Sequence, residues 1–421
     1  MRFFVPVTNP SDMKFDDYRI SPDIKRNLET LGFRRPTDIQ YKAITPILKG
    51  DDVLAIAQTG TGKTAAFAIP IIDIVHQQKS SSRSEFLCCL VMVPTRELAL
   101  QITEVFQTIG KHTLVKTACV FGGVDQEPQI SKLKSGIDIL VATPGRMFDL
   151  VSQGHILLDK IQILVLDEAD HMLALGFIKD IRQLIHFLPK YRQTLFFSAT
   201  INPEIKELAY SLVTNPIRIE ISPKDPVAKN VTHSVAMIDM DDKRFFLERL
   251  IKEHPESKIL VFVRTKVRAE RVFKAMERVD IKTVTIHGDK EQKDRLDVMT
   301  LFKSGEVKVL IATDVSARGI DIPDVDYVIN YDLPDVAENY VHRVGRTGRG
   351  VKKGLAVSFC SPEEKPVLDE IETFLGQKVS VLIIDKEEYT ATVDLSLDNP
   401  NDWKALMREE EQKPKSKKKK K

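Results

Sequence analysis

The sequence lacks the long apolar segments of membrane and secreted proteins. Its longest uninterrupted apolar stretches have the length of a strand, as in Ile163-Leu164-Val165-Leu166, whereas a helix that crosses a bilayer needs about 20 such residues. The first twelve residues carry two prolines and no apolar core of the kind found in a secretory signal. We therefore expect no association with membranes and a cytoplasmic location.

Cysteine is also scarce. The chain has four, and none shows the Cys-x-x-Cys or Cys/His spacing of a metal site: Cys88, Cys89, Cys119 and Cys360. Disulfide frameworks are typical of short secreted chains, which this chain does not resemble in length. Packing in a hydrophobic core is the expected role of all four residues.

The length and charge suggest two domains and a basic end. At 421 residues the chain exceeds one ordinary domain, so we expect two, each with its own core. The formal net charge is +2, but Lys413 to Lys421 contain seven lysines and no acid, and without these seven the net charge would be −5. This tail is either a solvated extension or a sequence-independent contact with phosphates, and both readings stay open.

Short apolar runs alternate with helical patterns twice along the chain. Runs that are apolar at every position indicate central strands of a parallel sheet covered by helices on both faces. We therefore predict an α/β protein with two tandem doubly wound parallel-sheet domains. The expected strands are 53–57, 87–93, 115–121, 139–142, 163–166, 194–197, 259–263, 283–287, 309–313, 327–330 and 356–359.

The domain boundaries follow from breaks in this alternation. Pro223 and Pro226 interrupt the pattern among charged residues, which favours a short flexible linker there. The predicted division is an N-terminal domain, a linker, a C-terminal domain, and an acidic and basic extension that ends in the lysine tail: 1–220, 221–228, 229–380 and 381–421.

A phosphate-binding pattern follows the first expected strand. The segment Ala57-Gln58-Thr59-Gly60-Thr61-Gly62-Lys63-Thr64 leads into a helix, so its backbone N–H groups can converge on phosphate oxygens. We predict that Lys63 contacts the β- and γ-phosphates of ATP and that the Thr64 hydroxyl ligates Mg²⁺. Ala57 replaces the first glycine of the usual pattern, and an ordinary turn is the alternative. The Gly-Lys-Thr sequence in this context favours nucleotide binding.

Two carboxylates stand at the end of a buried strand. Asp167-Glu168-Ala169-Asp170 follows the apolar run at 163–166, and ligands bind at the carboxyl ends of strands in open α/β sheets. We predict that Asp167 holds the Mg²⁺ and that Glu168 orients or deprotonates the attacking water. A solvated helix start is the alternative, which the upstream phosphate loop makes less favoured.

The second half has arginines in place of a phosphate loop. His342-Arg343-Val344-Gly345-Arg346-Thr347-Gly348-Arg349 contains three arginines at intervals of three residues. A solvated basic turn is one reading. An arginine delivered from another domain can, however, stabilise the charge on a transferring phosphoryl group. We predict an ATPase that works only when its two domains close.

Taken together, these motifs closely resemble the DEAD-box RNA helicase family, from about Phe15 to about Phe374. The resemblance implies two RecA-like domains and ATP as the nucleotide. It assigns residues 32–40, which include Phe33, to an adenine-reading Q motif in which Gln40 bonds the base and Phe15 adds an aromatic contact. The implied coupling of hydrolysis to unwinding involves contact between the Asp-Glu-Ala-Asp segment, which ends in Asp170, and Ser198, Ala199 and Thr200.

The resemblance also implies how RNA and nucleotide are held. Gly319 and Asp321 would contact the nucleotide, and Arg346 and Arg349 would act as arginine fingers. Exposed Thr, Arg and Gly N–H groups at strand ends suit contact with phosphate and 2′-OH groups without reading of bases. The implied RNA contacts are Pro94, Thr95, Arg96, Gly122, Gly123, Thr143, Pro144, Gly145, Arg146, Arg264, Gly288 and Thr313.

The resulting functional prediction is an RNA-stimulated ATPase. It would bind the RNA backbone without sequence specificity and locally unwind short duplexes or remodel RNA–protein complexes. An ATP-gated RNA clamp with little unwinding shares every motif, and a DNA motor or a nucleotide-dependent assembly protein is a third possibility. Expected partners are single-stranded or short duplex RNA, with ribosomal or ribonucleoprotein assemblies as candidate contexts, and the expected state is a monomer.

Overall fold

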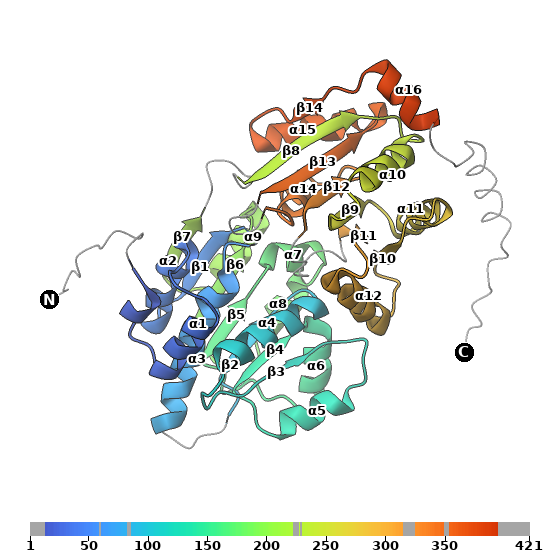
Figure 1. Ribbon diagram of the computed structural model, residues 1–421. Helices are drawn as coiled ribbons and strands as arrows, with labels where there is room; N and C mark the ends of the chain where they lie inside the picture. The colour runs from blue at the N-terminus through green and yellow to red at the C-terminus, as the bar shows by residue number, and fades with distance from the viewer. Residues whose placement is uncertain are drawn as a thin grey trace. The chain divides into compact units, whose positions relative to one another are not determined.

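The computed structural model describes residues 13–58, 60–81, 86–221, 227, 230–314, 325–348 and 353–394 (Figure 1). These residues form two compact units that divide near residue 228. Each unit is built on a seven-stranded parallel sheet with interleaved helices, which confirms the predicted fold class. Most of the predicted linker, the positions of Thr59, Gly319, Asp321 and Arg349, and the lysine tail lie outside the described residues.

The sheet of the first unit has the strand order β3-β4-β2-β5-β6-β1-β7, and every neighbouring pair is parallel. All carboxyl ends therefore meet at one edge of the sheet. The strands are β1 (Val53–Ala57), β2 (Cys89–Met92), β3 (Thr117–Val120), β4 (Ile139–Ala142), β5 (Ile163–Leu166), β6 (Gln193–Ser198) and β7 (Ile217–Ile221).

Helices cover both faces of this sheet. Val53 and Ala55 of β1 belong to one hydrophobic cluster, with residues of α1 to α4, whereas Leu54 and Ile56 belong to a second cluster with residues of α5 to α9. Because successive side chains of a strand point to opposite faces, the side chains on both faces of this sheet must be apolar. The helices are η1 (Phe15–Asp17), α1 (Pro22–Thr30), α2 (Asp38–Leu48), α3 (Lys63–Ser81), α4 (Arg96–Ile109), α5 (Glu127–Lys134), α6 (Pro144–Ser152), α7 (Ala169–Ala174), α8 (Ile178–Ile185) and α9 (Pro203–Leu212).

The sheet of the second unit has the order β10-β11-β9-β12-β13-β8-β14 and is also parallel throughout. Its strands are β8 (Val231–Met237), β9 (Ile259–Val263), β10 (Thr283–Ile286), β11 (Val309–Thr313), β12 (Tyr327–Asn330), β13 (Gly354–Cys360) and β14 (Ser380–Leu382). The accompanying helices are α10 (Lys243–Glu253), α11 (Lys266–Arg278), α12 (Gln292–Ser304), α14 (Ala337–Val344), η2 (Pro362–Glu364), α15 (Lys365–Leu375) and α16 (Lys386–Asp394).

The second unit extends beyond the boundary expected at residue 380. Strand β14 pairs with β8, and α16 packs on α10, where the ring centroids of Tyr389 and Phe246 lie 4.9 Å apart. The Tyr389 hydroxyl donates a hydrogen bond of 2.8 Å to Asp242. The fold therefore continues to Asp394, and the expected extension begins too early. The run Val381-Leu382-Ile383-Ile384 is apolar, but the three β14 residues are exposed and the strand is recognised only through its pairing with β8.

The four cysteines are free; Cys88, Cys89 and Cys360 are buried, and Cys119 is partly buried. Burial raises the pKa of the Cys88 thiol to about 12, which leaves it protonated and unreactive at neutral pH. The expected packing role is confirmed. Among the described residues, no helix is both long enough and apolar enough to cross a membrane.

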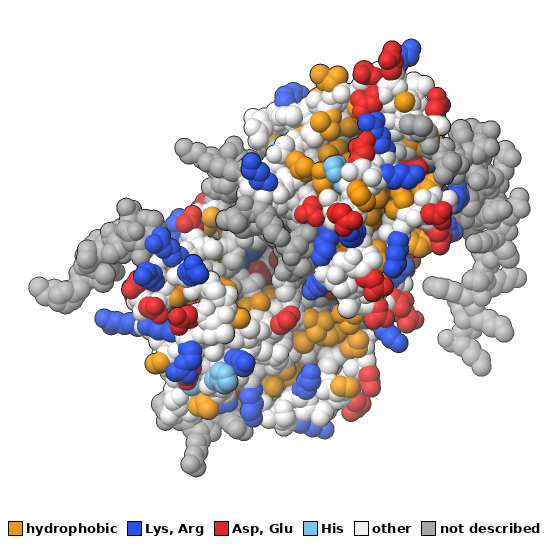
Figure 2. All heavy atoms as spheres, in the orientation of Figure 1, with side chains coloured by type: hydrophobic (Ala, Val, Ile, Leu, Met, Phe, Trp, Pro, Cys, Tyr) orange, Lys and Arg blue, Asp and Glu red, His pale blue; other side chains and the backbone are white. Residues whose placement is uncertain are grey.

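Basic and acidic side chains are interspersed over the face of the molecule shown in Figure 2. Neither sign of charge dominates that face of either unit. A contact with a polyanion there would have to come from particular loops rather than from a broad basic surface.

Candidate functional site

The phosphate loop of the first unit requires its glycines. Gly60 and Gly62 have φ angles of 83° and 92°, a left-handed backbone that side chains other than glycine rarely adopt. A Cβ at Gly62 would also lie only 2.6 Å from Nε2 of Gln40. Helix α3 begins directly afterwards at Lys63, so its N-terminal N–H groups face the loop.

The ammonium group of Lys63, directly after this loop, is buried. The residue is only 6% exposed. Within the part of the chain that the structure describes, its Nζ atom has no hydrogen-bond partner. A buried ammonium without partners is costly, because it loses its hydration without replacement. Phosphate oxygens would supply the missing acceptors, so the residues present fit a nucleoside triphosphate.

Gln40 links the predicted Q motif to the phosphate loop. Its Oε1 accepts a hydrogen bond of 3.0 Å from the backbone N–H of Thr37, and its Nε2 donates one of 3.2 Å to the carbonyl of Gly62. The first of these bonds belongs to a capping box at the start of α2, a Thr-x-x-Gln pattern that was readable in the sequence. The adenine contact of Gln40 stays a prediction.

The two aromatic residues of the Q motif contact each other. The rings of Phe15 and Phe33 meet edge to face with centroids 5.8 Å apart, and Phe15 is buried in the core formed with α1 to α4. Such a pair holds η1 against the segment that precedes α2. The structure thus shows Phe15 in contact with Phe33, and Gln40 in contact with the phosphate loop.

Asp167 stands at the end of β5, where it is 2% exposed. Burial raises the pKa of its carboxyl group to about 6, although the nearby positive charge of Lys63 lowers it. Its Oδ1 accepts a hydrogen bond of 3.0 Å from the backbone N–H of Glu168. A carboxylate oxygen of this kind is a ligand type that Mg²⁺ prefers.

This raised pKa makes a prediction for Asp167→Asn. A carboxyl group with a folded pKa near 6 stabilises the protein at low pH, and that contribution disappears as the pH rises through 6. Without nucleotide or Mg²⁺, the variant should therefore gain about 1.5 kcal/mol relative to the natural protein between pH 5 and pH 7.5. Urea unfolding at both pH values measures this, and a difference that is independent of pH would contradict the raised pKa.

Glu168 and Asp170 complete the acidic segment. Glu168 has a left-handed backbone with φ 52°, which costs a non-glycine residue about 1 to 2 kcal/mol. The Oδ2 atom of Asp170 accepts hydrogen bonds of 3.2 Å from the backbone N–H groups of Ala199 and Thr200 and from the Thr200 hydroxyl. The expected contact between the two motifs is therefore present. Ser198, at the end of β6, is fully buried beside it.

Loops at the ends of β2, β3 and β4 meet on the first unit. Thr95 caps α4 by accepting a hydrogen bond of 3.3 Å from the N–H of Leu98. The guanidinium of Arg96 lies so close to Gly123 that a Cβ there would be 2.1 Å from Nη1. From the next loop, Arg146 donates a bond of 2.8 Å to the carbonyl of Val124. The structure thus brings the predicted RNA contacts of this unit together, with the others beside them: Pro94, Gly122, Thr143, Pro144 and Gly145.

In the second unit, Arg343 is an internal anchor. It is 1% exposed, and its Nε and Nη2 atoms bond the two carboxylate oxygens of Asp314 at 2.5 and 2.7 Å. A further bond of 2.7 Å reaches the carbonyl of Asp332. Arg346 follows at the end of α14 and is also buried, at 4% exposure. The family resemblance assigned the arginine-finger role to Arg346 and gave Arg343 no role.

The predicted RNA contacts of the second unit lie at the carboxyl ends of three neighbouring parallel strands, β9, β11 and β10. The guanidinium of Arg264 pairs with Asp335 at 3.0 Å and with Glu364 at 3.2 Å, so acidic groups of its own unit already engage it. Gly288 is exposed after β10, and Thr313 is buried at the end of β11. Their contact with RNA stays a prediction.

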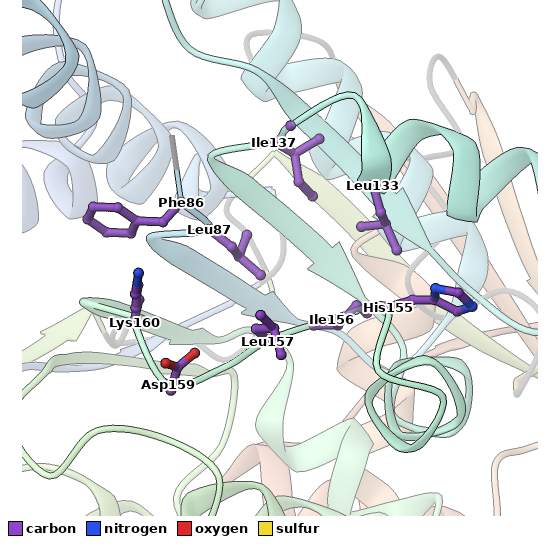
Figure 3. Close-up of a pocket in the computed structure, with 10 residues that line it drawn as sticks. Phe86, Leu87, Leu133, Ile137, His155, Ile156, Leu157, Asp159 and Lys160 are labelled. Carbon is purple, nitrogen blue, oxygen red and sulfur yellow. The ribbon is translucent and has the colours of Figure 1, made fainter. Parts of the chain in front are cut away.

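A hollow of about 350 Å³ lies away from these residues. Figure 3 shows its lining, which comes from segments that precede β2, β4 and β5: Phe86, Leu87, Leu133, Ile137, His155, Ile156, Leu157, Asp159 and Lys160. It therefore sits at the amino-terminal edge of the sheet, opposite the edge that carries Lys63 and Asp167. Ligands of open α/β sheets bind at the carboxyl edge, so the hollow is not the nucleotide site.

Comparison with known proteins decides the family. Residues 37–208 match the DEAD/DEAH box helicase model, and residues 242–351 match the helicase conserved C-terminal domain. The chain is 41% identical to the ATP-dependent RNA helicase RhlB of Shewanella frigidimarina, over 90% of this chain and 88% of that protein. The chain belongs to the DEAD-box family of ATP-dependent RNA helicases. It is also 39% identical to DbpA of Bacillus subtilis, over 90% and 78% of the two chains.

Solved structures agree with this DEAD-box assignment. S. cerevisiae Dbp5 bound to RNA and ADP BeF3 is 29% identical, with a TM-score of 0.77 and coverage of 94% of this chain and 98% of that chain. Mss116p bound to ssRNA and AMP-PNP is 27% identical, with a TM-score of 0.83 and coverage of 96% and 87%. The tandem arrangement of two RecA-like units is thus common to all three chains.

One residue of this DEAD-box site escaped the motif analysis. His171 lies on α7, three residues after Glu168, and is 4% exposed. Its Nδ1 atom is 3.4 Å from Oε2 of Glu168. Glu168 precedes the first residue of α7, so the Glu-x-x-His spacing at the start of this helix was the signal available in the sequence.

Proposed function

We propose that this chain hydrolyses ATP in its first domain and uses the reaction to unwind or remodel RNA. The buried and unpartnered ammonium of Lys63, at the end of a glycine loop and near the buried carboxyl of Asp167, carries this proposal among the described residues. Such a group needs an anion, and a loop at a helix N-terminus binds phosphate. Membership of the helicase family supports ATP as the nucleotide.

The residues of the first domain would divide the chemistry among them. Lys63 and the loop N–H groups bind the β- and γ-phosphates, while Thr64 and Asp167 would hold Mg²⁺, which neutralises phosphate charge when bound. Glu168 orients the attacking water and accepts its proton as the oxygen attacks the γ-phosphorus. The bond between the β- and γ-phosphates breaks, and ADP and phosphate leave. Phe15, Phe33 and Gln40 would select adenine.

The second domain would complete this reaction. Arg346 and Arg349 are proposed to stabilise the charge that develops on the γ-phosphate oxygens, with Gly319 and Asp321 as further nucleotide contacts. Arg343 supports this role, because its anchorage to Asp314 holds the end of α14 in place. Hydrolysis would then depend on domain closure, which ATP and RNA drive together.

The RNA is proposed to contact the loops after β2, β3 and β4. There the guanidinium of Arg96 lies against Gly123, and Arg146 donates a hydrogen bond to the carbonyl of Val124. Arginine side chains and glycine N–H groups suit phosphate and 2′-OH contacts, so base sequence would matter little. Dbp5 and Mss116p have been solved with RNA bound, which supports the same partner here. The action would be local strand separation rather than long translocation.

The decisive test compares nucleic acids. ATP turnover of the full chain should rise at least about tenfold more with RNA than with DNA of the same sequence, because 2′-OH contacts distinguish the two. Steady-state ATPase assays at one salt concentration measure this, with a reaction lacking nucleic acid as the baseline. Equal stimulation by the two polymers would contradict an RNA-specific function and favour a general nucleic-acid motor.

A further inference from the structure

The carboxylate of Glu168 needs to be held in one direction. A group that takes a proton from an attacking water must lie within hydrogen-bond distance of it, and a misplacement of about 1 Å can lower the rate substantially. Glu168 has a flexible side chain, which is only 13% exposed, and an unusual left-handed backbone at the start of α7. Other side chains must therefore restrict its orientation.

His171 meets this requirement from the same short helix. Its side chain is 5% exposed, so the ring has little freedom to turn. Its Nδ1 atom faces Oε2 of Glu168 at 3.4 Å. Since an ionised carboxylate can only accept hydrogen bonds, Nδ1 is the donor of this pair. The distance is long for a hydrogen bond, as is common for catalytic groups before substrate binds.

The backbone of His171 connects the same pair to the coupling motif. Its N–H donates a hydrogen bond of 3.1 Å to Oδ1 of Asp170. The other oxygen of Asp170 accepts the bonds from Ala199 and Thr200. A continuous set of contacts therefore runs from Thr200 through Asp170 and His171 to Glu168.

We propose that His171 is a positioning residue that orients the Glu168 carboxylate toward the attacking water through its Nδ1–H group. This inference rests on the role proposed for Glu168. It concerns the step of hydrolysis and not the binding of ATP, because His171 lies on α7 and not in the phosphate loop. Loss of the donor should therefore lower kcat and leave KM for ATP nearly unchanged.

Three substitutions separate a donor at Nδ1 from a residue that merely fills space. The amide nitrogen of Asn occupies nearly the place of Nδ1, whereas the longer side chain of Gln places its amide near the position of Nε2. Leu fills the volume without a donor. In RNA-stimulated turnover of the full chain, His171→Leu and His171→Gln should lower kcat about tenfold with KM for ATP within about twofold. His171→Asn should keep kcat within about threefold of the natural protein.

The outcomes distinguish this inference from the proposed function. If Glu168→Gln abolishes turnover while His171→Leu and His171→Gln keep normal kcat, the role of His171 is overturned and that of Glu168 stands. If Glu168→Gln retains normal turnover, both fall. An equal loss in the Asn and Leu variants, or a rise in KM as large as the fall in kcat, also overturns the inference. Thermal unfolding checks each variant, and if His171→Leu does not fold, the comparison of Asn with Gln decides.

Discussion

Replacing Glu168 with Gln should lower RNA-stimulated ATP turnover at least about a hundredfold, because the residue that orients or deprotonates the attacking water is lost. Binding of ATP should stay nearly intact, since Lys63 and the loop N–H groups still hold the phosphates. The amide has the size of the carboxylate, so the buried surroundings of α7 change little. Steady-state turnover and fluorescent-nucleotide binding on the same preparation measure the two quantities.

A matched control comes from another glutamate of the first unit. Glu207 on α9 has a side chain that is 75% exposed and pairs with Arg182 across the surface. Surface pairs of this kind contribute little, so Glu207→Gln should leave both turnover and binding unchanged. Turnover of Glu168→Gln that equals the control would remove Glu168 from the mechanism.

Replacing Arg346 with Ala should be similarly severe, with a loss of turnover of about a hundredfold or more, because a guanidinium stabilises the charge of the transition state. Arg346→Lys should restore only a small part of the rate, since a point charge cannot reproduce the planar fork. ATP binding to the first domain should persist in both variants. Single-turnover hydrolysis at saturating ATP and RNA isolates this step from substrate binding.

Arg343, three residues earlier, provides a control variant whose expected effect is on stability. Its guanidinium is bidentate to Asp314 inside the second unit, so Arg343→Ala leaves a carboxylate without its partner. We expect a loss of stability of about 3 to 5 kcal/mol, seen in thermal unfolding. Arg346→Ala should still unfold in a single cooperative transition above the assay temperature. Normal turnover of Arg346→Ala would refute its role, and equal destabilisation of both variants would assign Arg346 to the fold.

Much of the fold was readable because the parallel sheets leave a strong pattern. The ranges predicted for β1, β4, β5, β9, β11 and β12 agree with the structure. Each of these strands is apolar on nearly every residue, since helices cover both faces. The predicted ends of β2 were less accurate, because the apolar run from 87 to 93 continues beyond the paired residues Cys89–Met92.

Three strands were missed for a physical reason. Strands β7 and β8 have several exposed positions and lack continuous apolar runs, whereas β14 has only three residues, all exposed, at the edge of its sheet. Each is held by a partner that is distant along the chain, as when β8 pairs with β13 more than a hundred residues away. Neither local propensity nor periodicity reports such a pairing.

The sequence by itself determined which chemical groups the protein offers and in what order: a glycine loop with Lys63 and Thr64, two carboxylates after a buried strand, and arginines in the second half. These are local patterns, and their spacing survives without knowledge of the fold. Only the tertiary structure decided how those groups behave. It buries Lys63 without a partner and raises the pKa of Asp167. It also pairs Arg343 with Asp314 and places His171 against Glu168. The burial of a side chain and its partners depend on residues that only packing brings together.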